Sequence, residues 1–182
     1  MKNLELQKCI LGPVYTNCYF LKNKTTGEMI VIDPADFPEK IYEKVIQMGG
    51  KPAAILLTHG HFDHIMAAQA VKEKYNIPIY ACLQEEEMLR EPSVNMTAHY
   101  GKNCSIIPDV LLNDLEVFQV AGFTIQIIHT PGHTKGSCCY YIEEEEVLFS
   151  GDTVFYGSVG RTDFPGGSTA DIVRSLHKLV DS

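Results

Sequence analysis

The feature that most constrains this chain is a run of metal-ligand side chains, Thr-His-Gly-His-Phe-Asp-His, at residues 58–64. His59, His61 and His64 supply three imidazoles and Asp63 supplies a carboxylate, all within six consecutive positions. In a chain with 7 histidines, a chance H-x-H-x-D-H pattern has a probability on the order of one in a thousand or less. The alternative is a polar loop whose histidines satisfy backbone groups. The pattern favours a metal site.

The composition is that of an ordinary globular protein. With 182 residues, 45% of them hydrophobic and 21% charged, we expect one domain spanning residues 1–182. The first residues lack the apolar core of a signal peptide and no apolar run could span a bilayer, so we expect a cytoplasmic protein with reduced cysteines. A net charge of -8 disfavours nucleic acids and anionic membranes as partners, which leaves a small-molecule substrate.

Apolar runs separated by turn residues predict two groups of strands. Helices are predicted where apolar residues recur every three or four positions, and Ser168 begins a capping box before the last of them. We expect residues 93–108 to form a loop over the site and residues 143–146 a solvated turn. The predicted strands are 4–10, 18–21, 29–32, 53–57, 77–81, 117–120, 123–128, 137–142 and 147–149, and the predicted helices are 38–48, 65–75, 84–90 and 168–180.

Two further ligand-class residues follow predicted strands. His133 lies in a Pro-Gly turn just after the strand that ends near His129, and Asp152 follows the strand 147–149. The histidine run likewise follows the buried strand 53–57. Each turn alone is weak evidence, because Pro-Gly-His and Gly-Asp occur in ordinary turns. Three such segments in one chain predict a shared metal site, since closing a coordination sphere needs ligands from several directions.

These segments resemble the metallo-β-lactamase superfamily and, within it, the glyoxalase II-like hydrolases. The matching sequences are T-H-G-H-F-D-H at 58–64, T-P-G-H-T-K-G-S at 130–137 and S-G-D-T-V-F at 150–155. Shorter matches occur at 12–13, 16–19, 32–34 and 160–164, so the similarity covers nearly the whole chain. The resemblance implies an α/β fold, an αββα sandwich of two mixed sheets flanked by helices, with metals at one edge between the sheets.

The resemblance also implies a set of metal ligands. His59, His61 and His133 would hold a first ion, Asp63 and His64 would belong to a second site, and Asp152 would bridge the two. Zinc is the default metal for such ligands, although iron and manganese are also accepted. The family's β-lactamases have Cys or Ser where this chain has Asp152, which makes antibiotic hydrolysis an unexpected activity.

One ligand of the family pattern has no counterpart in this sequence. Family members carry a last histidine on a Pro-Gly-His-Gly-like turn after the final helix, whereas His177 lies inside the predicted helix 168–180. The expectation is therefore a domain lacking the family's C-terminal segment, with one open position beside Asp63, His64 and Asp152. Truncation is the favoured explanation; a second copy that donates the ligand, or a one-metal enzyme, are the others. An uncovered sheet edge would also invite a homo-oligomer.

The resemblance implies thioester hydrolysis in the manner of glyoxalase II, in which a metal-bound hydroxide, oriented here by Asp63, attacks the acyl carbonyl. The glutathione-binding helical domain is absent, and Arg161 and Asp163 stand where that family has Lys and Tyr. Arg161 is a candidate for binding a substrate carboxylate, with an Arg161–Asp163 contact as the equal alternative. The rival function is a persulfide dioxygenase with one iron on His59, His133 and Asp152. A third is a non-catalytic member of the fold.

Overall fold

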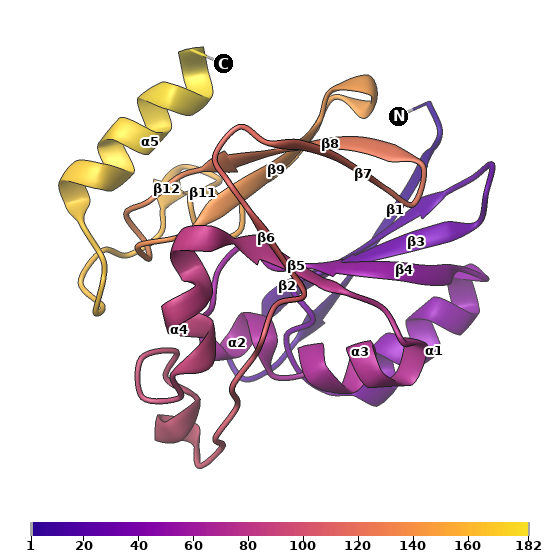
Figure 1. Ribbon diagram of the computed structural model, residues 1–182, viewed down its shortest axis with the longest axis horizontal. Coiled ribbons are helices and arrows are strands. Elements are labelled where there is room, and N and C mark those ends of the chain that lie inside the picture. The colour runs from indigo at the N-terminus through magenta and orange to yellow at the C-terminus, as the bar shows by residue number, and fades with distance from the viewer. Residues whose placement is uncertain (1, 182) are drawn as a thin grey trace.

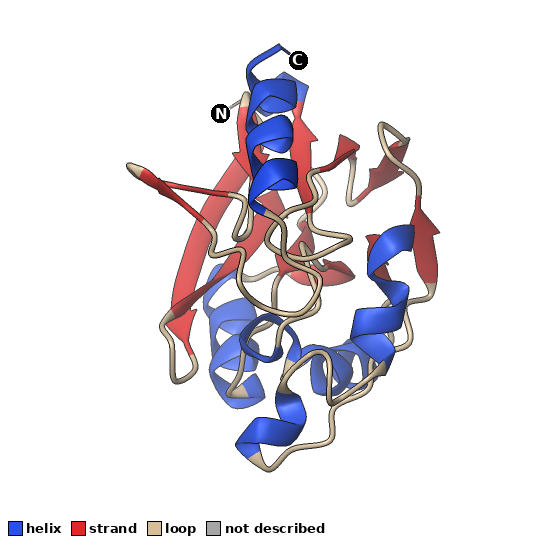
Figure 2. Cartoon of the chain, turned by 90° about the vertical axis from the view of Figure 1, so that its left-hand side faces the viewer, coloured by secondary structure: helices blue, strands red, loops and turns tan. Residues whose placement is uncertain are grey.

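The computed structural model describes residues 2–181, which form two packed β-sheets with helices outside them (Figure 1). Figure 2 shows the C-terminal helix at the opposite side of the molecule from the helices that cover the first sheet. The first sheet has the strand order β1-β2-β3-β4-β5-β6 and the second β10-β9-β8-β7. The first six strands are Leu4–Leu11, Thr16–Asn23, Glu28–Ile32, Lys51–Leu56, Ile79–Cys82 and Val110–Leu112, and the next four are Val117–Val120, Phe123–His129, Cys138–Ile142 and Val147–Phe149.

The first sheet changes direction along its width. Strands β1 to β3 are antiparallel, and β3 to β6 are parallel. Parallel neighbours require crossover connections, which here run through α1 (Pro38–Met48) and α3 (Ala68–Tyr75). In α1, proline stands at the start and Gly49, with φ 59°, ends the helix, while Ile41, Val45 and Met48 are buried. Their spacing places all three on one helix face, against the sheet.

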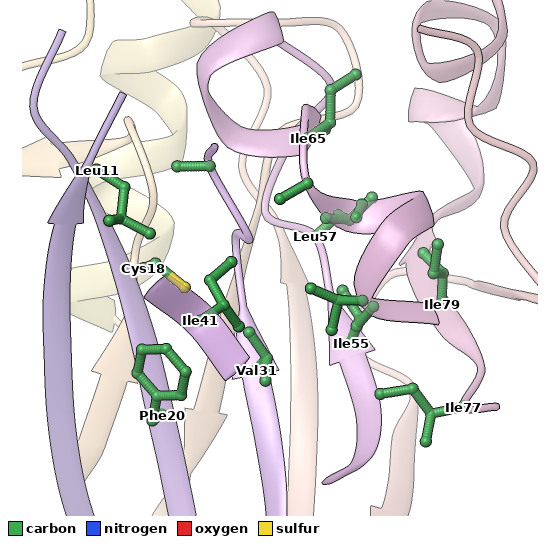
Figure 3. Packing of buried hydrophobic residues seen from close by; sticks show 14 of the residues in the cluster. Leu11, Cys18, Phe20, Val31, Ile41, Ile55, Leu57, Ile65, Ile77 and Ile79 are labelled. Atoms are coloured by element: carbon green, nitrogen blue, oxygen red, sulfur yellow. The ribbon is translucent and has the colours of Figure 1, made fainter. Parts of the chain in front are cut away.

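Alternation along the strands divides the apolar residues between two cores. In β3, Met29 and Val31 point to the core under the helices, whereas Ile30 and Ile32 point to the core between the sheets. Figure 3 shows the first core, in which Phe20, Val31 and Ile55 come from three neighbouring strands. Because both faces of the central strands are covered, their sequences are continuously apolar rather than alternating.

The second sheet brings two strand ends to the same edge. Strand β9 pairs antiparallel with both β8 and β10, so β8 and β10 run in the same direction and end at the same side. The backbone amide of Cys138, at the start of β9, donates to the carbonyl of Thr58 at 2.9 Å. This bond joins that edge of the second sheet to the loop that follows β4 in the first.

The last helix, α5 (Thr169–Asp181), lies by the outer face of the second sheet (Figure 1). The predicted cap is present, since the Asp171 amide donates to the Ser168 hydroxyl at 3.2 Å. Ser175 donates to the Pro131 carbonyl at 2.7 Å, and Lys178 contacts Asp114 at 2.7 Å. These contacts anchor α5 on the turn that carries His133.

Most predicted elements are confirmed, with a few corrections. The helix expected over 65–75 is instead α2 (Phe62–Ile65) followed by α3, because the Ala67 amide donates to the Pro34 carbonyl at 3.0 Å and leaves the helical ladder. The helix expected over 84–90 is a 3₁₀ turn, η1 (Leu83–Glu85), followed by α4 (Glu86–Arg90).

Other corrections concern short elements and the turn at 143–146. The second sheet is antiparallel throughout, although two mixed sheets were expected. Glu145, expected in a solvated turn, is buried and accepts the Asn3 amide at 2.6 Å, an interaction that local sequence does not reveal. The sequence reading also missed β6, the 3₁₀ turn η2 (Thr97–Tyr100), the 3₁₀ turn η3 (Glu143–Glu145) and the hairpin of β11 (Val154–Phe155) and β12 (Ser158–Val159).

All six cysteines are free thiols, as expected. Within residues 2–181 no helix combines the length and the apolar character needed to cross a membrane.

Candidate metal centre

The ligand-class residues meet at one edge of the two sheets. The loop after β4 carries His59, His61 and His64, the turn after β8 carries His133, and the loop after β10 carries Asp152. All four histidines are buried. The structure therefore brings together the three segments that the sequence reading had grouped.

The four imidazoles form a compact cluster. The His59 ring centroid lies 4.9 Å from that of His61, 4.0 Å from that of His64 and 4.8 Å from that of His133. The Nδ1 of His61 faces the Nε2 of His133 at 2.9 Å. Protonated imidazoles at such distances would repel one another strongly, so neutral rings, the form that binds metals, suit this cluster.

Three of these rings are held from outside the cluster through their Nδ1 atoms. The Nδ1 of His133 lies 2.8 Å from the Arg161 carbonyl, to which it can only donate. The Nδ1 of His64 lies 2.9 Å from the Asp33 carboxylate, and that of His59 lies 3.2 Å from the Thr58 hydroxyl. With Nδ1 engaged, the Nε2 atom of each ring is left to face the cluster. Such outer partners are typical of metal-binding histidines.

Two buried nitrogens have no hydrogen-bond partner, the Nε2 atoms of His59 and His61. Buried polar atoms without a partner are rare and call for an explanation, such as a bound ion. Burial lowers the pKa of His61 to about 3, and the neighbouring His133 lowers it further. Burial also lowers the pKa of His59 well below its usual value. The donor atoms thus have the chemistry that a divalent metal requires.

His64 differs from the other rings because carboxylates surround it. Burial lowers its pKa, but the charge of Asp33 and hydrogen bonds with Asp152, Asp33 and Asp63 outweigh burial and raise the pKa well above its usual value. Its Nε2 lies 3.3 Å from Asp63 Oδ2 and 3.4 Å from Asp152 Oδ1. In the metal-free protein this ring holds a proton where a cation would otherwise sit.

The two carboxylates are less buried than the rings. Burial raises the pKa of Asp152, but hydrogen bonding and charge at His64 lower it more, and the net shift is downward. The pKa of Asp63 is also lowered against the effect of burial, by His64 and by the Thr16 hydroxyl, which donates to Oδ2 at 2.5 Å. Both side chains are therefore anionic at neutral pH.

Potential ligand atoms fall into two groups. Those of His59, His61 and His133 lie within 4.8 Å of one another, as do those of His59, His64 and Asp152. The first group is the predicted first site. The second contains His59 where the sequence reading had placed Asp63, whose Oδ2 is engaged by Thr16. The assignment of the individual ligands stays a prediction.

Two cavities meet at the cluster, and Val14, Asp63, Asp152 and Phe155 line both. The hairpin-side cavity, of about 460 Å³, also contacts His64. The loop-side cavity, of about 470 Å³, contacts His61 and His133 and lies against the expected overhanging segment. Side chains that only the hairpin-side cavity contacts include Tyr15, Tyr19, Leu148 and Tyr156, and those that only the loop-side cavity contacts include Phe62, Met96, Tyr100 and Phe164.

Arg161 lines the loop-side cavity, but its guanidinium is paired. Nε and Nη2 bond the two carboxylate oxygens of Asp163 at 2.7 and 2.6 Å. The group also stacks over the Phe164 ring at 3.9 Å. The alternative contact considered for Arg161 is thus present, and its role in substrate binding stays a prediction. His129, expected to make local hydrogen bonds, lies 3.0 Å from the Lys135 carbonyl.

Sequence reasoning missed residues that support the cluster without facing it. Asp33, noted only as part of a family match, accepts bonds from the Thr58 amide and hydroxyl as well as from His64. Thr16 contacts Asp63, and Glu85 contacts the two loops that carry the first group. A buried acidic residue is unusual, but its burial is not visible in the local sequence.

Comparison with known proteins agrees with this geometry. Residues 11–181 match the family model described as the metallo-beta-lactamase superfamily. A probable metallo-hydrolase of Bacillus subtilis, YqgX, is 35% identical over 97% of this chain and 84% of its own length. The hydroxyacylglutathione hydrolase GloC of Haemophilus influenzae is 32% identical over 80% of this chain and 70% of its own.

Two solved structures are similar at the level of both sequence and fold. The B3 metallo-beta-lactamase BLEG-1 has a TM-score of 0.89 and 38% identity, over 95% of this chain and 84% of that one. TTHA1623, solved in a di-iron-bound form, has a TM-score of 0.83 and 33% identity, over 96% and 86%. The family match, the αββα fold and the buried histidine cluster agree: the chain belongs to the metallo-beta-lactamase superfamily of metal-dependent hydrolases.

Proposed function

We propose that this protein hydrolyses thioesters of small molecules in the manner of glyoxalase II, with zinc as the default metal and iron or manganese as alternatives. The observation that carries the proposal is the position of Asp152. Its Oδ1 lies 3.4 Å from the Nε2 of His64 and its Oδ2 3.5 Å from the Nε2 of His133. One carboxylate thus faces both halves of the cluster, as a ligand shared by two ions would.

Divalent ions in such a site supply Lewis-acid polarisation of a carbonyl and lower the pKa of a coordinated water. His59, His61, His64, His133 and Asp152 would hold them. Asp63 faces both cavities and is kept anionic, so it can orient the attacking water and accept its proton. The Thr16 hydroxyl fixes the orientation of that carboxylate.

The two cavities suit a substrate with two arms joined at a reactive bond. Asp63 and Asp152 line both cavities, so a thioester carbonyl at this junction would extend its acyl group one way and its thiol the other. The similarity to the hydroxyacylglutathione hydrolase of Haemophilus influenzae supports a thioester as the reacting group. Binding of a substrate carboxylate by Arg161 would require the guanidinium to leave Asp163, an exposed pair that costs little to break.

A second candidate is β-lactam hydrolysis, which the similarity to BLEG-1 favours. The presence of Asp152 argues against this activity, and both activities can be measured on one preparation. We expect the metal-loaded protein to cleave S-lactoylglutathione or a related acyl thioester and to leave a chromogenic cephalosporin intact.

The same preparation tests the rival functions. Cephalosporin cleavage without thioester cleavage would replace the proposal with a lactamase. Oxygen uptake that depends on glutathione persulfide, with one iron per chain, would replace it with the dioxygenase. Asp152→Asn serves as the control variant and should abolish thioester cleavage, because it removes the charge that faces both histidines.

A further inference from the structure

A buried carboxylate outside the metal cluster contacts both loops that carry the first group of histidines. Glu85 ends the 3₁₀ turn η1 and is 1% exposed. Its Oε1 accepts the Gly60 amide at 2.8 Å, and its Oε2 accepts the Gly136 amide at 2.8 Å and the Thr134 hydroxyl at 3.0 Å. All three donors are neighbours of histidines in the cluster.

The sequence positions of the donors explain why this matters. Gly60 lies between His59 and His61, and Thr134 directly follows His133. The first loop comes from the first sheet and the second loop from the second sheet. Glu85 therefore joins two segments that approach the metal site from opposite sides.

The packing around Glu85 is tight enough to fix the separation of these loops. A Cβ atom added at Gly136 would lie 2.2 Å from the Glu85 backbone nitrogen, and one added at Gly60 would lie 2.9 Å from Cγ of Met88. Each loop thus rests directly on the segment that Glu85 begins. Glu85 lines neither of the two cavities at the cluster, so contact with a substrate there is not its role.

We propose that Glu85 is a positioning residue, which sets the distance between the His59–His61 loop and the His133 turn and so the geometry of the first metal group. Three donors converge on its two oxygens, and only a carboxylate offers acceptors in both directions. Glutamine at this position would turn an NH₂ group toward the donors of one loop. That loop would lose its acceptor and shift, while the histidines themselves remain present.

The proposal is tested with Co²⁺, whose visible spectrum reports ligand geometry, on the full chain. Glu85→Gln should bind Co²⁺ about 10- to 100-fold more weakly than the wild type, the usual effect of losing an outer-shell partner, and should change the Co²⁺ absorption bands. Glu145→Gln is the matched control. Glu145 is also buried and accepts the Asn3 amide, but it lies in η3, at the opposite end of β9 from the site.

Glu145→Gln should leave the Co²⁺ affinity and bands unchanged even where it lowers stability, which separates positioning from a general loss of folding. A second pair serves if Glu85→Gln does not fold. Thr134→Val removes one donor and should alter the bands, whereas Thr134→Ser keeps the hydroxyl and should preserve them.

The inference rests on the proposed metal centre, and its failure can be told apart from failure of that centre. Wild-type affinity and bands in Glu85→Gln, or identical bands in Thr134→Val and Thr134→Ser, would overturn the role of Glu85 alone. A wild-type chain that binds no Co²⁺ would overturn the metal centre and this role together.

Discussion

At the scale of single residues, the metal cluster depends on side chains that orient the histidines. His64 illustrates this, because Asp33 contacts its Nδ1 and also accepts both the amide and the hydroxyl of Thr58. Asp33 has left-handed backbone geometry with φ 51° and is buried. A strained, buried carboxylate next to a histidine cluster indicates a supporting role in the site.

Replacing Asp33 with asparagine should weaken the half of the site that contains His64. An amide is a poorer acceptor for the imidazole and the Thr58 groups, so we expect metal affinity to fall about 10- to 100-fold, measured by competition with a chromogenic chelator. Asp36→Asn, three residues away and paired with the exposed Lys102, is the control and should bind metal normally. Equal affinities in the two variants would contradict this role.

Glu85 should make stability depend on pH. Burial raises its pKa from 4.5 to about 7, against bonds from Gly60, Thr134 and Gly136 that lower it. The folded state therefore binds this proton more tightly than the unfolded chain, and its contribution to stability is present below pH 4.5 and lost as the pH rises through 7. Relative to Glu85→Gln, the wild type should lose up to about 3 kcal/mol over that range, measured by urea unfolding of metal-free protein. A constant difference would disprove the shift.

The sequence identified the residues that face the site better than those that support them. The six predicted ligands lie together because their spacing is compressed into short segments after strands. Glu85 and Asp33 act on groups 25 to 51 positions away in the sequence. Neither has a local signal that distinguishes it from an exposed carboxylate, so only the folded arrangement reveals its function.

At the scale of elements, β9 connects the second sheet to the metal loop. The Tyr140 hydroxyl, fully buried, donates to the Leu57 carbonyl at 2.9 Å. Tyr140→Phe should lower the free energy of unfolding by about 1 to 2 kcal/mol, because a buried acceptor loses its partner. Tyr141→Phe, at the next position and partly exposed on the outer face, is the control and should change stability by less than about 0.5 kcal/mol. Similar losses in urea unfolding would contradict the account.

The segment 93–108 was expected to overhang the site, and its 3₁₀ turn contributes to the loop-side cavity. The Tyr100 ring stacks on Phe62 with centroids 3.9 Å apart, and both line the cavity. Apolar walls favour an apolar arm of the substrate.

We therefore expect kcat/KM to rise by up to about fourfold per methylene added to one arm of a thioester, since burying a methylene is worth about 0.8 kcal/mol. Tyr100→Ala should flatten that series. Tyr156→Ala, whose ring lines only the hairpin-side cavity, should leave it intact. A series that stays steep in Tyr100→Ala would show that the arm binds elsewhere.

Elements with strong periodicity could be predicted, and those fixed by distant contacts could not. The buried face of α1 and the strands β7 and β10 follow from local pattern. Strand β6, of three residues, forms by pairing with β5. The break between α2 and α3 depends on the Pro34 carbonyl. Short elements of this kind have too few residues to show a period.

At the scale of the whole molecule, the metal centre follows from how the sheets are joined. Strands β4, β8 and β10 end at one edge, and the Cys138–Thr58 bond closes it. The αββα fold was expected from the family resemblance. The sequence alone gave strands in two groups but no means of placing one sheet on the other, since that packing depends on the two apolar cores together.

The central claim is that this edge forms a metal-dependent thioester hydrolase centre, and the most direct test is the rate of thioester cleavage as metal is added to the metal-free protein. We predict no cleavage without metal, a rate that rises with the metal bound per chain, and no recovery in His133→Ala. Cleavage at full rate in the metal-free protein, or metal binding with no thioester cleavage at any occupancy, would contradict the account.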